Sequence, residues 1–212
     1  MEPKIKNCRH CGAEVPVTFS AMMARFAELP ISCDQCVAIA KEAAKQAELA
    51  AILREIAPRS SMTPDDGRLD RARPFCEAFP KSMEGKLNLF LSGPCRTGKT
   101  YFAWQLIKAA LLNGRSVGSL SGTLFDVSQL YSLSSPDVLL FDEFAKVDFT
   151  DKASMKFVFN LVNARTESQK ITIFVSNISM DELEAIATRA SPMMAPSIFA
   201  RINESKIARV IK

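Results

Sequence analysis

The stretch "LFLSGPCRTGKTYF", residues 89–102, constrains the fold more than any other. A short apolar run ends at a glycine, and an apolar helical pattern begins directly after a polar turn. The turn fits the pattern G-x-x-x-x-G-K-[ST], which between a strand and a helix points successive backbone N–H groups at a phosphate. We therefore predict a phosphate-binding loop for a nucleotide, made of Gly93, Pro94, Cys95, Arg96, Thr97, Gly98, Lys99 and Thr100.

The chemistry of this loop follows from its last two side chains. The start of the following helix adds unpaired N–H groups and the positive end of its dipole. Lys99 can reach the β- and γ-phosphates, and the Thr100 hydroxyl can join the ligands of a Mg²⁺ ion. The alternative is an ordinary strand-to-helix turn that happens to contain Gly and Lys.

Beyond residue 87, short apolar runs alternate with helical patterns. This alternation predicts an α/β fold around a five-stranded parallel sheet. The expected strands are Leu87–Ser92, Ser116–Leu120, Asp137–Asp142, Ile171–Ser176 and Lys206–Ile211. The expected helices are Lys99–Leu112, Phe125–Tyr131, Lys152–Glu167 and Met180–Thr188.

The run "DVLLFDEF", residues 137–144, is an apolar strand that ends in two carboxylates. Ligands of open parallel sheets bind at the carboxyl ends of the strands, which is where a phosphate loop also lies. We expect Asp142 to hold Mg²⁺ and Glu143 to polarise the attacking water. The alternative is a strand that merely ends in solvated acids.

Two later polar residues are candidates for the same site. Asn177 follows the run "ITIFVS" and could orient the water or touch the γ-phosphate, although Asn also favours turns and helix caps. Arg201 precedes the last expected strand and could stabilise the transition-state charge in a neighbouring subunit. A solvated arginine at a helix end is the alternative for Arg201.

Four of the six cysteines form two Cys-x-x-Cys pairs near the N-terminus, with 21 residues between the pairs. Two such pairs can place four thiolates around one Zn²⁺ ion at ~2.3 Å. Two disulfides or four free buried thiols are the alternatives. We expect a zinc site made of Cys8, Cys11, Cys33 and Cys36.

The remaining segments set the expected domain order. Residues 37–56 are rich in Ala, Glu, Lys and Leu and predict a helix, and the polar stretch 59–74 predicts a linker. We expect a zinc module over 1–38, a helix and linker over 39–75, and a nucleotide-binding domain over 76–212. The net charge of +4 permits a nucleic-acid partner without demanding one. We find no apolar run long enough for a membrane span and no signal peptide, so we expect a cytoplasmic protein.

The motifs "GPCRTGKT", "VLLFDEF", "NARTESQKITIFVSN" and "IFARI…ARVI" occur in an order and spacing that resemble one family. It is the group of AAA+ ATPases that load replicative helicases, the bacterial DnaC and DnaI proteins, with the transposition helper IstB as a relative. The resemblance covers roughly residues 80–212. It implies ATP as the nucleotide, and a replicative helicase as the partner, in DNA replication.

The same resemblance assigns a role to each candidate residue. Gly93–Thr100 correspond to the Walker A loop, Asp142 and Glu143 to Walker B, and Asn177 to sensor 1. Arg201 corresponds to the arginine finger, which implies self-association. Several loaders resemble this chain in carrying a zinc module, which contacts or regulates the helicase.

Two departures from the family pattern bear on function. Arg96 stands where family loops usually carry Gly, and we expect its backbone to keep a negative φ. Only 16 residues, 121–136, separate the second and third expected strands, where loaders usually place helices that contact single-stranded DNA. This short segment weakens the expectation of DNA binding. An IstB-like transposase helper, or a nucleotide-responsive adaptor with negligible turnover, are therefore alternative functions.

Overall fold

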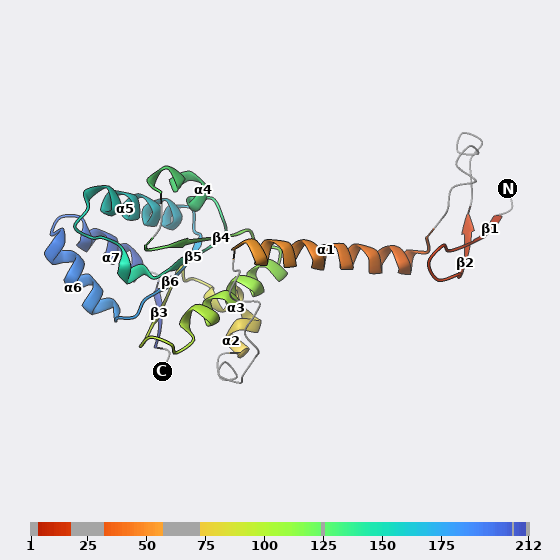
Figure 1. Cartoon of the computed structure of the whole chain (residues 1–212), viewed down its shortest axis with the longest axis horizontal. Coiled ribbons are helices and arrows are strands. Elements are labelled where there is room, and N and C mark those ends of the chain that lie inside the picture. The colour runs from red at the N-terminus through yellow and green to blue at the C-terminus, as the bar shows by residue number, and fades with distance from the viewer. Residues whose placement is uncertain (1–3, 18–31, 57–72, 124–125, 205, 211–212) are drawn as a thin grey trace. The chain divides into compact units, whose positions relative to one another are not determined.

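The computed structural model describes residues 4–17, 32–56, 73–123, 126–204 and 206–210 (Figure 1). The chain divides into two compact units, residues 1–52 and 53–212. The expected domain borders after residues 38 and 75 stay predictions. None of the described helices combines the length and the apolar character that a membrane crossing requires.

The first unit begins with a hairpin that the sequence reasoning did not predict. Strands β1 (Lys4–Asn7) and β2 (Glu14–Val17) pair antiparallel, and the turn between them carries the first cysteine pair. Gly12 has φ +75°, a left-handed conformation that glycine adopts without steric cost. Helix α1 (Asp34–Ile56) starts three residues before the predicted 37–56, so Cys36 lies in its first turn.

The second unit contains one five-stranded sheet in which every pair of strands is parallel. This confirms the predicted α/β class. The strand order across the sheet is β4 (Val117–Ser121), β5 (Val138–Asp142), β6 (Ile171–Val175), β3 (Asn88–Ser92) and β7 (Lys206–Val210). Because the strands are parallel, all their carboxyl ends lie along one edge.

Helices cover both faces of this sheet (Figure 1). Helix α3 (Lys99–Leu112) packs on one face, and α2 (Arg73–Ala78) packs against α3. On the other face, α5 (Lys152–Glu167) contacts α4 (Leu130–Ser134) and α7 (Ala195–Glu204). Helix α6 (Met180–Ala190) contacts α7.

Alternating strand residues supply the core on each face. Phe90, Phe141 and Phe174 pack with the α5 and α7 side, where they join a cluster of phenylalanines around Phe144. Leu89 and Leu91, which flank Phe90 on β3, are fully buried as well. Since successive side chains of a strand point to opposite faces, a run buried throughout indicates a sheet covered on both sides.

Three helical segments differ from the sequence prediction. Helix α2 was not predicted, and its first two residues fall in the expected linker 59–74. The helix expected over 125–131 begins later, as a 3-10 turn at Val127–Gln129 followed by α4, because the Asp126 side chain caps the turn by accepting from Ser128 N. Residue 125 lies outside the described residues. Helix α7 was not predicted; its Pro196 stands in the first turn, where a missing N–H costs nothing.

Candidate functional site

The phosphate loop lies between the end of β3 and the start of α3, as predicted. Gly98 caps α3 with φ +89°, and Phe102 N donates to Gly98 O to close the first helical turn. Arg96 has φ +65°, so the expectation of a negative φ at this position is wrong. The loop path requires a left-handed residue here, and this costs a non-glycine residue about 1–2 kcal/mol.

Three loop side chains make contacts that bear on phosphate binding. Lys99 is buried, and its Nζ donates to the Pro94 carbonyl at 2.6 Å. Thr97 Oγ1 donates to the same carbonyl at 3.0 Å. Thr100 Oγ1 donates to Asp142 Oδ1 at 3.3 Å. This last contact joins the start of α3 to the end of the acidic strand β5.

Asp142 is half-buried at the carboxyl end of β5. Burial raises the pKa of this carboxyl, while the hydrogen bonds from Glu143 N and Thr100 oppose the rise. A carboxylate and a hydroxyl side by side are oxygen ligands of the kind Mg²⁺ prefers. Thr100 and Asp142 therefore fit a magnesium site.

The Glu143 carboxylate is engaged on both oxygens. Lys146 Nζ lies 2.5 Å from Oε1, and the hydroxyls of Ser121 and Thr123 donate to Oε2 at 3.2 and 3.0 Å. The hydrogen bond from Lys146 is the main cause that lowers the pKa of Glu143. Glu143 itself has φ +53° and precedes a 3-10 turn, Phe144–Lys146.

The remaining two predicted residues lie at opposite edges of the sheet. Asn177 is exposed just beyond the carboxyl end of β6, the strand between β5 and β3. Arg201 lies at the amino edge, because Asn88, the first residue of β3, donates to the carbonyls of Arg201 and Ile202. The structure thus brings Lys99, Thr100, Asp142, Glu143 and Asn177 to one edge of the sheet and excludes Arg201 from it.

Four residues around Glu143 were missed by the sequence reasoning: Ser121, Gly122, Thr123 and Lys146. Gly122 N donates to Asp142 O at 2.8 Å, and a Cβ added to Gly122 would lie 2.2 Å from Glu143 O. Only glycine allows this close approach of two chain segments. A Ser-Gly-Thr run directly after a strand was the available signal.

The four predicted cysteine ligands meet in the first unit. Their sulfur atoms all lie within 4.8 Å of one another, and Cys11 Sγ and Cys33 Sγ are 3.6 Å apart. A tetrahedron with Zn–S bonds of ~2.3 Å places its sulfurs about 3.8 Å apart. None of the described cysteines forms a disulfide.

Backbone amides and neighbouring thiols shape this cluster. Hydrogen bonds from the Cys33, His10 and Cys11 amides lower the pKa of Cys8 to about 5. The side chains of Cys11 and Cys33 raise the pKa of Cys36 to about 12. Four converging thiol groups of this kind fit a zinc ion, which binds them as thiolates.

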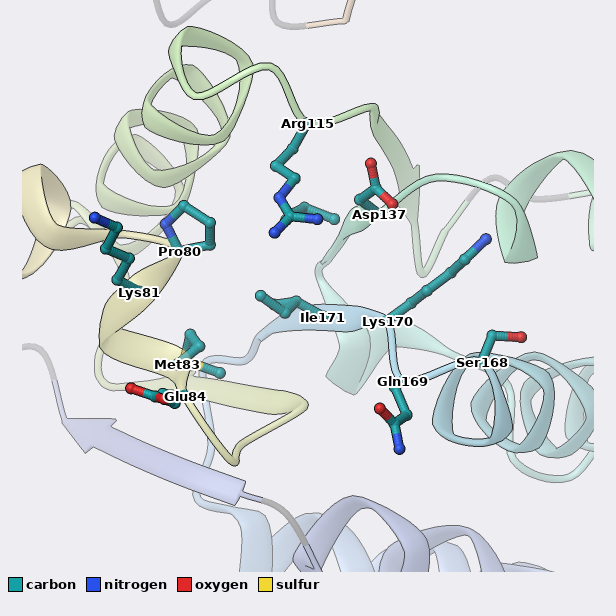
Figure 2. Close-up of a pocket in the computed structure, with 11 residues that line it drawn as sticks. Pro80, Lys81, Met83, Glu84, Arg115, Asp137, Ser168, Gln169, Lys170 and Ile171 are labelled. Atoms are coloured by element: carbon teal, nitrogen blue, oxygen red, sulfur yellow. The ribbon is translucent and has the colours of Figure 1, made fainter.

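A separate hollow of about 720 Å³ opens at the amino edge of the sheet (Figure 2). Arg115 extends into it from beyond α3, between Asp137 and the Pro80–Glu84 segment. Asp137 already accepts from Ser116 N and Oγ. Because the phosphate loop lies at the carboxyl edge, this hollow is not part of the candidate nucleotide site.

No protein-family model and no curated protein matches the chain. Similar solved structures include a DNA replication initiation factor, the DnaC helicase loader and DnaI, at 18%, 18% and 21% identity and TM-scores of 0.54, 0.53 and 0.53. The matches cover 74%, 72% and 75% of this chain and 50%, 94% and 90% of those chains, so this chain spans half the length of the first. The chain therefore shares a fold with these three proteins over about three quarters of its length.

Proposed function

We propose that this chain is an AAA+ protein that binds and hydrolyses ATP and loads or remodels a replicative DNA helicase. The observation that carries the chemistry is the contact between Thr100 and Asp142, which joins the phosphate loop to the acidic strand. The fold shared with the DnaC helicase loader and DnaI supports the task.

Each residue at the carboxyl edge has a proposed role. The amides of Gly93–Thr100 and the Lys99 ammonium group hold the phosphates. Bound between Thr100 and Asp142, Mg²⁺ would neutralise phosphate charge. Glu143 polarises the attacking water, and Asn177 orients it. Hydrolysis then alters how the protein holds its partner.

Arg201 would act on a second copy of the chain. It lies at the amino end of β3, whereas the phosphate loop follows the carboxyl end of that strand. A five-residue strand rises by ~13 Å, which a side chain from the same subunit cannot span around the sheet. The proposed arginine finger therefore requires self-association.

The cysteine module is proposed to hold one Zn²⁺ through Cys8, Cys11, Cys33 and Cys36. A module of this size buries little apolar surface, so metal binding would supply most of its folding free energy. We further propose that residues 1–38 form this module, 39–75 a helix and linker, and 76–212 the ATPase domain. The module would contact the helicase.

Nucleotide binding can be tested at Lys99 with a control on the same helix. We expect Lys99→Ala to abolish ATP binding in a titration, while Lys108→Ala, an exposed residue of α3, binds as the unchanged protein does. ATP should also protect the exposed Cys95 from alkylation, and this protection should be lost in Lys99→Ala. Equal affinity of Lys99→Ala and the unchanged protein would refute the assigned site.

Hydrolysis and partner choice need separate measurements. Glu143→Gln should bind ATP but hydrolyse it at least tenfold more slowly. Adding single-stranded DNA to the same assay tests whether DNA is a partner. Co-purification with a replicative helicase, rather than with a transposase, would support loading over an IstB-like role.

A second candidate function is a nucleotide-responsive adaptor with negligible turnover. It is favoured by one observation: both oxygens of the Glu143 carboxylate are occupied by other side chains. An unchanged protein that binds ATP but hydrolyses it no faster than Glu143→Gln would establish the adaptor.

A further inference from the structure

Lys146 makes the shortest contact with the carboxylate of Glu143, the proposed general base. The sequence motifs give Lys146 no role. Its ammonium nitrogen lies 2.5 Å from Glu143 Oε1. The two side chains therefore form an ion pair in direct contact.

The backbone around this pair is held by the core. Lys146 N donates to Glu143 O at 2.8 Å in the 3-10 turn Phe144–Lys146. Phe144 in that turn is fully buried, with its ring centroid 4.8 Å from those of Phe141 and Phe174. Packing of the buried Phe144 therefore fixes the turn that places Lys146 beside Glu143.

A general base must offer a free oxygen to water at about 2.6–3.2 Å. Two hydroxyl groups already donate to Glu143 Oε2, and Lys146 takes up one of the acceptor directions that remain, on Oε1. We propose that Lys146 is a positioning residue that holds Glu143 in an arrangement of low hydrolytic activity. Hydrolysis accelerates when this ion pair breaks.

The exposure of the pair limits the size of the effect. The Lys146 and Glu143 side chains are 53% and 40% exposed. Water and salt screen an ion pair of this kind, so the expected gain on breaking it is about two- to fivefold in rate, or ~0.4–1 kcal/mol. A stronger restraint would require burial that this pair does not have.

This inference rests on the proposed role of Glu143 in hydrolysis and is tested on the full chain. Lys146→Met should raise kcat about two- to fivefold with KM for ATP unchanged, and Lys146→Arg should restore the low rate. Lys156→Met, which removes another exposed positive charge, on α5, is the matched control. The rate ratio between Lys146→Met and the unchanged protein should fall toward one as NaCl rises from about 50 to 500 mM.

A double variant separates positioning from other roles of the lysine. In a Glu143→Gln background, Lys146→Met should leave the residual rate unchanged, because no carboxylate remains to be restrained. A kcat that falls or stays constant in Lys146→Met overturns the inference, as does an equal rise in the double variant. If Glu143→Gln hydrolyses ATP like the unchanged protein, the proposed role of Glu143 fails instead.

Discussion

Replacing the buried Arg165 tests how the second unit is held together. This residue is 1% exposed at the end of α5. Its guanidinium group donates to one hydroxyl and four carbonyls on two segments of the chain, residues 133–136 and 171–172. The acceptors are Thr172 Oγ1 and the carbonyl oxygens of Leu133, Ser134, Pro136 and Ile171.

Arg165→Met keeps most of the side-chain volume and removes all five donor contacts. A buried acceptor left unsatisfied costs about 1–3 kcal/mol. Ser134 and Pro136 are only half-buried, so water can replace the lost donor there. Arg165→Met also removes the cost of burying a charge that is bonded to no carboxylate among the described residues, and this offsets part of the remaining loss. We expect a net loss of about 2–4 kcal/mol in the free energy of unfolding.

The assay can report on this unit alone. Trp104 is the only tryptophan of the chain and lies on α3, so its fluorescence in urea follows the unfolding of the sheet unit. Arg189→Met, at an exposed position of α6, controls for loss of charge. Arg165→Lys should lose an intermediate amount, because lysine keeps the charge without the planar fork. A loss in Arg165→Met within about 0.5 kcal/mol of the control would refute this reasoning.

Three further outcomes are expected. Elemental analysis should find one zinc per chain, and a strong chelator should remove it without moving the urea midpoint of Trp104, since the cysteines belong to the other compact unit. Asp137→Asn should lower stability at neutral pH, because hydrogen bonds from Ser116 lower the pKa of Asp137. This contribution is full above the unfolded pKa of about 3.9, so urea titrations should show the gap between variant and unchanged protein closing as the pH falls below that value. Arg96→Val should unfold about 1–2 kcal/mol more easily than Arg96→Gly, because a β-branched residue resists the φ of +65°.

The sheet and the phosphate loop were predictable because they depend on local sequence patterns. The β3 strand, the loop and α3 form one continuous segment, and the predicted helix bounds Lys99–Leu112 and Lys152–Glu167 match the structure. Apolar runs at 138–141 and 171–175 could only be buried on both faces, which indicates a parallel sheet with helices on either side. The order of the strands across the sheet was not predicted, because it depends on contacts between segments far apart in the sequence.

The side chains that contact Glu143 could not be predicted from local sequence patterns. Ser121 and Thr123 lie some twenty positions before Glu143, and their contact with it depends on β4 pairing with β5 in one register. A shift of one residue would turn their side chains to the opposite face of the sheet. Lys146 is close to Glu143 in sequence, but its approach depends on the positive φ of Glu143. A glutamate in a sequence does not indicate this conformation.

The sequence motifs and the side chains around them therefore answer different questions. The motifs predict which residues would hold the phosphates, the metal and the base. In the proposed function, turnover depends on how free the Glu143 carboxylate is, and three side chains outside the motifs contact it. An ion pair this exposed can be exchanged at little cost, so a partner that offers Lys146 another anion could accelerate hydrolysis without touching the phosphate loop.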